Sequence, residues 1–155
     1  KADGLENYTC TEEKGYYIIT GEWKTGSKII FAFDMETQFY QADDRVREDY
    51  GKLAVMRGPV VFCAEEADNG NNLHLYEILP MHPVLESEVM VEGKNYPLLS
   101  VSARKKVTTK PDQQLYVKYR KPEYETARLN MIPYFAWANR GENEMAVWFN
   151  KAEED

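Results

Sequence analysis

Residues 53–64 read LAVMRGPVVFCA, two short apolar runs on either side of Arg57-Gly58-Pro59. Proline removes a donor from a strand ladder and glycine relaxes the backbone. We therefore expect a bulge or bend at this point, and not one straight strand through the whole segment. The segment predicts two neighbouring strands with a structural turn formed by Arg57, Gly58 and Pro59.

The same strand pattern recurs along the chain, because apolar residues return at every second position in short runs that Gly, Pro, Asn and Asp separate. Phe31 and Phe33, for example, share one face of the strand expected at residues 27–35. About ten short strands and no long helix predict an all-β fold, an antiparallel, jelly-roll-like β-sandwich in a single domain. The main expected strands are residues 16–20, 27–35, 53–56, 60–64, 73–79, 98–103, 115–120, 131–138 and 144–150.

The sequence shows no recognisable interior linker, so we expect a single domain. We expect residues 15–150 to form the β-sandwich domain, with residues 1–14 as an N-terminal extension or first edge strand. Residues 151–155 are an acidic tail, which we expect to fray.

Length and charge exclude several classes of protein. The chain has 155 residues, with 19 Lys and Arg against 26 Asp and Glu, so its formal net charge is −7. A chain of this length can bury a core without disulfides or metals. The acidic balance argues against nucleic acid as a partner, since the only dense basic run is Arg104-Lys105-Lys106. The longest apolar runs are strand-sized, so no membrane-spanning segment is predicted.

Paired carboxylates are the simplest candidates for catalysis, as in glycoside hydrolysis. Neighbours on a strand point to opposite faces, so an adjacent pair cannot close on one bond. We therefore expect the adjacent pairs to be solvated and predict no catalytic residue, although a nonadjacent pair stays open. The adjacent pairs are Glu12/Glu13, Asp43/Asp44, Glu65/Glu66 and Glu153/Glu154.

Metal and cofactor sites are not predicted either. A closed zinc site would need His74, His82, Cys10 and Cys63 to converge, and their spacings match no standard pattern. Two free thiols are the simpler reading of the cysteines, with their pairing left open. The chain also lacks a Gly-x-Ser-x-Gly elbow and a glycine-rich phosphate loop.

The final third of the chain is rich in aromatic residues, among them Tyr134, Trp137 and Trp148. On a strand, Tyr134 and Ala136 would share one face while Phe135 and Trp137 would share the other. Aromatic residues on both faces fit a strand that is covered on both sides, and hence a domain docked on something else. The alternative is a platform on which the rings stack against sugars.

The clearest hairpin is expected between residues 131–138 and 144–150, where Gly141 can supply a positive φ. Arg140 stands beside this glycine, as Arg57 stands beside another. A guanidinium can bond loop carbonyls or bind a carboxylate through two bonds. We expect structural roles for both arginines, Arg57 at its bend and Arg140 at the terminal hairpin.

Residues 132–141, IPYFAWANRG, followed by Met145-Ala146-Val147-Trp148, resemble the C-terminal signature of glycoside hydrolase family 127, the β-L-arabinofuranosidase-like family. A second block is similar to the strands that follow the catalytic barrel of that family. This block includes Gly15-Tyr16, residues 23–26, 29–35 and 51–63, Glu65 and Asp68-Asn69.

The resemblance implies an upstream (α/α)6 barrel that carries zinc, a cysteine nucleophile and an acid/base glutamate, followed by β-sandwich modules. Those barrel motifs have no counterpart here, so their roles are not assigned to Cys10, Cys63 or Glu65. The implied function is a noncatalytic accessory domain that packs on the catalytic barrel of an enzyme acting on L-arabinofuranosides. The alternative is a carbohydrate-binding module that binds an arabinose-containing glycan through exposed aromatic residues such as Trp137.

Overall fold

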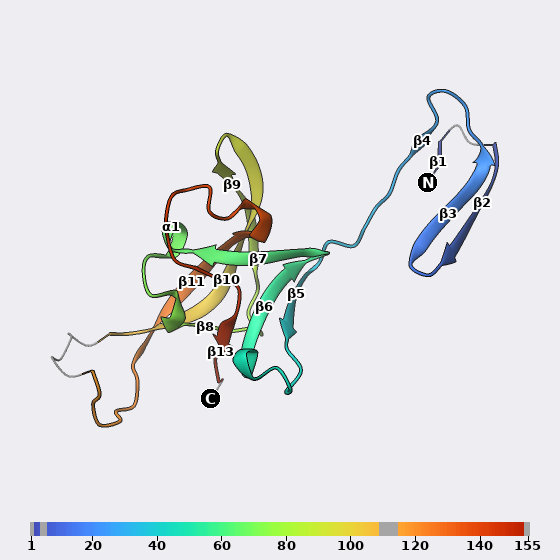
Figure 1. The fold of residues 1–155 in the computed structure, drawn as a ribbon. Coiled ribbons are helices and arrows are strands. Elements are labelled where there is room, and N and C mark those ends of the chain that lie inside the picture. The colour runs from blue at the N-terminus through green and yellow to red at the C-terminus, as the bar shows by residue number, and fades with distance from the viewer. Residues whose placement is uncertain (1, 4–5, 109–114, 154–155) are drawn as a thin grey trace. The chain divides into compact units, whose positions relative to one another are not determined.

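The computed structural model describes residues 2–3, 6–108 and 115–153, and the chain divides into two compact units, Lys1–Asp34 and Met35–Asp155 (Figure 1). The boundary was expected after residue 14. It lies after Asp34 because the strands on both sides of residue 14 pair with each other and so belong to the same unit.

The first unit contains two pairs of strands. Strands β2 (Glu6–Glu13) and β3 (Tyr16–Glu22) form an antiparallel hairpin, and β1 (Ala2–Asp3) pairs with β4 (Lys28–Ile29). The strand expected at residues 27–35 is thus only two residues long. Residues 30–36 form no strand pairing with the described residues.

The second unit holds the other strands and four short helical turns. The turns are η1 (Arg47–Asp49), α1 (Glu66–Asn69), η2 (Leu73–Leu75) and η3 (Tyr134–Ala136). The strands are β5 (Thr37–Gln41), β6 (Lys52–Arg57), β7 (Val60–Glu65), β8 (Tyr76–Ile78), β9 (Leu85–Val91), β10 (Lys94–Lys106), β11 (Tyr124–Pro133), β12 (Met145–Ala146) and β13 (Phe149–Lys151). None of the helices in the described part of the chain is long and apolar enough to span a membrane.

The strand pairings of this unit form a closed circuit. It runs from β6 through β7, β11, β10, β8 and β13 and back to β6, with β5, β9 and β12 attached to its edges. The pairs are antiparallel except that β13 runs parallel to β8. The all-β, sandwich-like fold expected from the sequence is confirmed.

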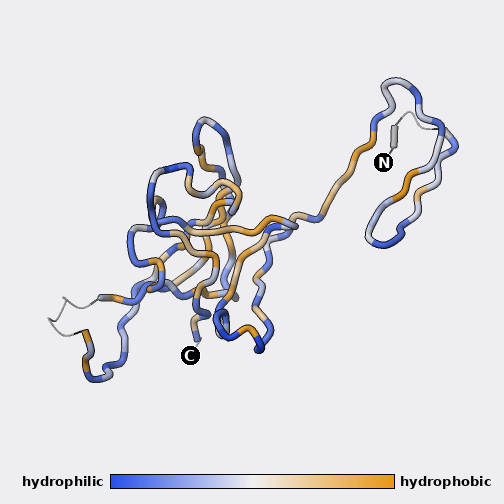
Figure 2. Tube along the Cα trace, viewed as in Figure 1, coloured by the Kyte–Doolittle hydropathy of each residue, from blue (hydrophilic) through white to orange (hydrophobic). Residues whose placement is uncertain are grey.

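Alternating side chains of the circuit fill one core. In the stretch 99–103 of β10 every second residue points inward, namely Leu99, Val101 and Ala103, and Leu129 and Met131 of β11 do the same. Figure 2 shows apolar stretches along these strands at the centre of the unit and hydrophilic residues in many of its loops. The remaining buried members of this core are Leu53, Val55, Phe62, Ala64, Leu73, Tyr76, Ile78 and Phe149.

The bend expected around Gly58 is confirmed as the turn between β6 and β7. Arg57 lies opposite Val60, and Gly58 has a φ of 54°, which favours glycine. The Gly58 amide also donates a hydrogen bond of 3.2 Å to the carbonyl oxygen of Glu36.

The hairpin expected between residues 131–138 and 144–150 is wrong. Strand β11 ends at Pro133, and the chain then turns through η3, because proline lacks the amide needed to continue the ladder. Strands β11 and β12 each pair with β7, and β13 pairs with β6 and β8. Arg140 therefore has no terminal hairpin to stabilise.

Two further expectations for the end of the sequence are corrected. Residues 115–120 were expected to form a half-buried strand, but they are exposed and irregular, with no described strand beside them. The tail at residues 151–153 does not fray. Lys151 belongs to β13, and Ala152 is buried, with its amide bonded to the carbonyl oxygen of Ile78 at 2.9 Å. Residues 154–155 lie outside the described residues.

Candidate docking surface

Three aromatic side chains project from η3 and the residue that follows it. Tyr134, Phe135 and Trp137 are 44%, 67% and 38% exposed, whereas Ala136 between them is buried. A strand would have alternated these residues between two faces. The helical turn, in which the Trp137 amide donates to the Tyr134 carbonyl oxygen at 3.3 Å, instead turns Ala136 inward and leaves the three rings exposed. We call Tyr134, Phe135 and Trp137 the aromatic surface.

Each ring of the aromatic surface contacts another aromatic ring. The ring centroids of Tyr134 and Trp137 lie 6.2 Å apart, and the Phe135 ring meets Tyr96 of β10 edge to face at 5.9 Å. Trp148, the third predicted aromatic candidate, is half-buried between β12 and β13. Among the described residues no ring contact joins it to the aromatic surface. The structure thus brings together two of the three predicted candidates, and Tyr96 is the partner that sequence reasoning missed.

Apolar packing and hydrogen bonds fix the backbone that carries the aromatic surface. Ala136 packs in a small apolar cluster with Cys63 and Ile132. The next residues are fixed by two hydrogen bonds: the side-chain amide of Asn139 donates to the carbonyl oxygen of Ala136 at 3.1 Å, and the amide of Ala138 donates to Glu65 Oε1 at 3.1 Å.

Arg140 continues this attachment as the centre of an ion cluster. Glu65 is fully buried at the end of β7, and its Oε2 accepts hydrogen bonds from Nε of Arg140, at 3.0 Å, and from Nη2. Asp68 of α1 binds the same guanidinium, with Nη1 to Oδ1 at 2.7 Å and Nη2 to Oδ2 at 2.6 Å. These hydrogen bonds, from Asp68 foremost, raise the pKa of Arg140 above its ordinary value. Arg140 therefore ties the loop after η3 to β7 and α1.

Asn69, at the end of α1, anchors the helix to β11. Its side-chain amide donates to the carbonyl oxygens of Glu65, at 2.8 Å, and Asn130, at 2.9 Å, while its Oδ1 accepts the Asn130 amide at 2.7 Å. The Tyr76 hydroxyl donates to the Asn69 carbonyl oxygen at 2.7 Å. Through Glu65, the ion cluster and the backbone that carries the aromatic surface thus belong to one network of hydrogen bonds.

Arg57, the other arginine given a structural role, is the last residue of β6, and its side chain reaches β9. Its Nε donates to Glu86 Oε2 of β9 at 3.1 Å, and the other oxygen of Glu86 accepts from the hydroxyl of Thr37 in β5 at 3.0 Å. Arg57 therefore links β6 to β9 through a carboxylate, and Gly58 and Pro59 form the turn beside it.

The candidate carboxylates that the structure describes have structural partners or are solvated, and Glu154 lies outside the described residues. Glu65 belongs to the ion cluster, and Glu66 accepts the amide of Glu144 at 3.1 Å. Asp43 pairs with Arg45 at 2.7 Å on the surface. The described residues contain no group of three or more His, Cys, Asp and Glu side chains placed to hold a metal.

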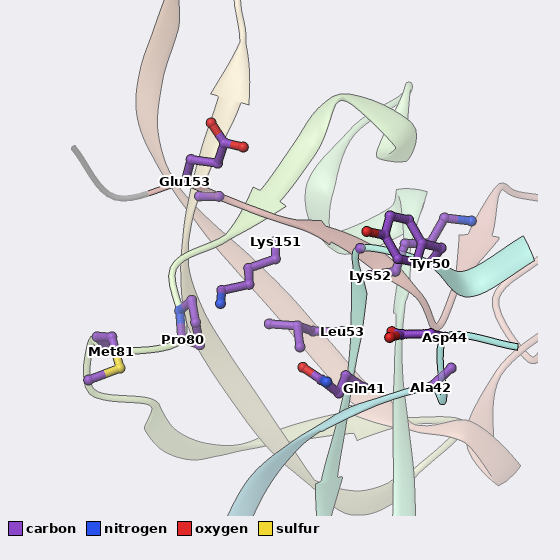
Figure 3. A pocket seen from close by; sticks show the side chains of 12 residues that line it. Gln41, Ala42, Asp44, Tyr50, Lys52, Leu53, Pro80, Met81, Lys151 and Glu153 are labelled. Carbon is purple, nitrogen blue, oxygen red and sulfur yellow. The ribbon is translucent and has the colours of Figure 1, made fainter. Parts of the chain in front are cut away.

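The second unit also has an open groove of about 840 Å³, whose lining includes none of the residues of the aromatic surface (Figure 3). Figure 3 shows Asp44 and Glu153, its two acidic side chains, at opposite ends. Sequence reasoning missed this groove because its lining comes from segments far apart in the chain. The lining residues are Gln41, Ala42, Asp44, Tyr50, Gly51, Lys52, Leu53, Pro80, Met81, Lys151, Ala152 and Glu153.

The two cysteines are free thiols in different environments. Cys10 is exposed, whereas Cys63 is buried, and burial followed by the nearby negative charge of Glu65 raises the pKa of Cys63 to about 12. Because only the thiolate is reactive, Cys63 should be inert in the folded chain.

We expect a thiol-specific chromogenic reagent to modify Cys10 alone in the folded chain and both cysteines after unfolding. The pKa of Cys63 lies above the ordinary 9.0, so its contribution to stability is fully present below about pH 9 and is lost as the pH rises toward 12. Cys10→Ser is the control and should leave no reactive thiol in the folded chain. Rapid modification of two thiols at pH 8 without unfolding would contradict the burial of Cys63.

Comparison with known proteins places this sandwich-like unit among the β-rich domains of glycoside hydrolases. Residues 37–150 match the glycoside hydrolase family 127 C-terminal domain. The chain belongs to this family, and the resemblance noted in the sequence is confirmed.

Relatives of the chain are much longer proteins. The chain is 34% identical over 141 residues to the non-reducing end β-L-arabinofuranosidase of Bifidobacterium longum subsp. longum, covering 88% of the chain and 21% of that enzyme. The crystal structure of Ara127N-Se, a GH127 β-L-arabinofuranosidase from Geobacillus stearothermophilus T6, matches 96% of the chain with 25% of its own, at 28% identity and a TM-score of 0.73. The GH127 β-arabinofuranosidase BT3674 matches 98% of the chain with 23% of its own, at 28% identity and a TM-score of 0.74. The chain therefore spans about a quarter or less of these relatives.

Proposed function

We propose that this chain is a noncatalytic accessory region of a family 127 glycoside hydrolase acting on L-arabinofuranosides, and that its aromatic surface packs on the upstream (α/α)6 catalytic barrel. The observation that carries the proposal is the exposed group of Tyr134, Phe135 and Trp137 on a fixed backbone. The zinc of such an enzyme would be held by the barrel and not by this chain.

The aromatic surface has the properties of an interface. Aromatic side chains are enriched where proteins meet, and a contiguous exposed apolar group on a soluble domain marks an interaction site. The Ala138 and Asn139 hydrogen bonds fix the backbone before contact, so little conformational entropy is lost on docking. A fixed surface of this kind favours permanent docking on a neighbouring domain.

The acidic residues of the chain support a noncatalytic role. A glycosidase that works through two carboxyl groups needs them on either side of the scissile bond, about 5–10 Å apart and open to substrate, and a cysteine nucleophile likewise needs an accessible acid/base carboxyl group beside it. Glu65 is buried and its oxygens are bonded to Arg140 and the Ala138 amide, so it cannot reach a sugar. Asp68 is engaged by the same guanidinium.

The test compares Tyr134→Ser/Trp137→Ser in this chain and in the longer gene product that contains it. In the 155-residue chain the melting temperature should fall less than in the longer protein, because Tyr134 and Trp137 are only 44% and 38% exposed there and lose only the contacts within the chain. In the longer protein the loss of two aromatic contacts should destabilise the docked state by about 2–4 kcal/mol. Differential scanning calorimetry of both proteins measures the difference.

The matched control is Tyr116→Ser/Tyr119→Ser, which removes two exposed rings from residues outside the aromatic surface. It should leave both melting temperatures unchanged. Equal melting temperatures for the Tyr134→Ser/Trp137→Ser variant and the control in the longer protein would exclude docking through this surface. Release of arabinose from an arabinofuranoside by the 155-residue chain would exclude the noncatalytic role. Saturable binding of arabino-oligosaccharides that Trp137→Ala abolishes without unfolding would favour a carbohydrate-binding module instead.

A further inference from the structure

The open groove of the second unit combines a buried apolar base with exposed apolar side chains. Its volume of about 840 Å³ lies in the range of sites for small ligands, roughly 300–1,000 Å³. Leu53 of β6 and Ala152, which follows β13, line it and are buried. Tyr50, just before β6, and Met81, after β8, also line it and are 71% and 80% exposed. A ligand in the groove would therefore find apolar contacts on several sides.

Polar side chains of the same lining are available to a ligand. Five of them make no side-chain hydrogen bond or ion pair with the described part of the chain, namely Gln41, Asp44, Tyr50, Lys151 and Glu153. Lys52 differs, because its Nζ donates to the carbonyl oxygen of Glu48 at 2.7 Å. An ammonium group donates hydrogen bonds, carboxylates accept them, and an amide does both. The lining can thus bind both the hydrogen and the oxygen of ligand hydroxyl groups.

These groups are distributed along the groove. Figure 3 shows Met81 on one side and Tyr50 with Asp44 on the other, with Lys151 and Gln41 between them. Polar and apolar contacts therefore follow one another from end to end, which suits an elongated ligand with hydroxyl groups along its length. The two carboxylates lie at opposite ends, so they do not flank a single bond as the acids of a glycosidase would.

The charge of the lining favours an uncharged ligand. Two lysines, Lys52 and Lys151, balance two acidic residues, Asp44 and Glu153, whereas the whole chain has a net charge of −7. A polyanion would gain no net attraction in the groove and would be repelled by the rest of the chain. A purely apolar ligand is also disfavoured, because it would take water from polar side chains without replacing its hydrogen bonds.

The backbone around the groove is already fixed. The Lys151 amide donates to the carbonyl oxygen of Gly51 at 3.0 Å, and the Ala152 amide donates to that of Ile78 at 2.9 Å. The bond from Lys52 to Glu48 connects η1 to the start of β6. Little ordering of the backbone is needed on binding, so even a few polar contacts can give measurable affinity.

We propose that this groove is a noncatalytic binding site for a short, uncharged oligosaccharide. The Tyr50 ring stacks on the apolar face of one sugar, while Gln41, Lys151 and the two carboxylates bind hydroxyl groups. The choice of L-arabinofuranosyl units as the sugar rests on the proposed function. The binding site itself is separate from the aromatic surface, since the two share no residue.

A nuclear magnetic resonance titration of the 155-residue chain with an L-arabinofuranosyl trisaccharide tests the inference. The trisaccharide should cause saturable shifts of the backbone amides of Gly51, Lys52, Lys151 and Ala152. Tyr50→Ser should weaken binding by about tenfold, which corresponds to about 1.4 kcal/mol. Its melting curve should stay close to that of the unchanged chain, because the ring is 71% exposed.

The matched control is Tyr116→Ser, which removes a ring that is 92% exposed and lies outside the groove. It should leave the affinity for the trisaccharide unchanged. Absence of a saturable shift, or equal affinity for Tyr50→Ser and the unchanged chain, would overturn the inference. A trisaccharide of galacturonate should bind more weakly, because its carboxylates meet Asp44 and Glu153. Equal or tighter binding of that anion would overturn the assignment of an uncharged ligand.

The same titration separates this inference from the proposed function. Binding that Trp137→Ala abolishes and Tyr50→Ser does not would place the sugar on the aromatic surface, and both proposals would then fail. Absence of binding would overturn the inference alone, because docking through the aromatic surface is measured by calorimetry of the longer protein. Binding that only Tyr50→Ser weakens would support the groove as the sugar site.

Discussion

Arg140→Ala is expected to lower the free energy of unfolding of the second unit by about 3–5 kcal/mol, the usual cost of leaving a buried charge without its partner. Arg140 is the cation that neutralises Glu65, a carboxylate with no exposed surface, and it also binds Asp68 through two hydrogen bonds. For a unit of this size the loss corresponds to a fall in melting temperature of roughly 10 °C or more. Calorimetry or circular dichroism measures it.

Two further variants give this prediction its controls. Arg45→Ala removes an arginine whose pair with Asp43 is exposed, so it should leave the melting curve unchanged. Arg140→Ala combined with Glu65→Gln should be less unstable than the sum of the two single changes, because the neutral amide no longer leaves a buried charge unpaired. An unchanged melting curve for Arg140→Ala would show that the ion cluster has no structural role.

Asn69→Ala is the second large effect, expected at about 2–4 kcal/mol because three hydrogen bonds to the backbone are lost and their partners are partly buried. The side chain bonds the carbonyl oxygens of Glu65 and Asn130 and the amide of Asn130. Denaturant titration of the variant measures the loss.

The control for this position is Asn95→Ala, since Asn95 makes a single exposed bond of 3.4 Å to Glu88. It should change stability little. Asn69→Asp keeps the acceptor but places a negative charge against two carbonyl oxygens, so it should be no more stable than Asn69→Ala. Full stability of the aspartate variant would mean that only the Asn130 amide matters.

Much of the fold could be predicted from local pattern. Residues 53–64 show two apolar runs and a turn, and they form β6, β7 and the bend at Gly58. Residues 98–103 alternate and form part of β10, whose inward residues build the core. In both cases side-chain alternation and burial agree, so the sequence signal is strong.

Alternation misled where no neighbouring strand exists. Residues 115–120 alternate as a half-buried strand would, yet they are exposed, because a strand needs a partner to satisfy its backbone and alternation does not supply one. Pro133 lies within the strand predicted at residues 131–138, although proline cannot donate a hydrogen bond to a strand ladder. Proline ends β11 there, and the turn that follows determines which aromatic rings are exposed.

The candidate site was harder to predict than the fold. Tyr134 and Trp137 were recognised by composition, but their fixation depends on Arg140 reaching Glu65, a residue 75 positions away in sequence. No sequence pattern around a single arginine or a single glutamate indicates that the two side chains form an ion pair. Only the three-dimensional arrangement of β7 and the loop after η3 joins them.

The closed circuit of strands has a consequence for the order in which the protein is made. Strand β13 completes the circuit between β6 and β8, and it is the last strand of the circuit to leave the ribosome. Until residue 151 has been synthesised, β6 and β8 each present an unpaired edge, which is a site for aggregation. We therefore expect the second unit to finish folding only after translation has passed its final strand, and a message truncated shortly before residue 149 to yield an insoluble product.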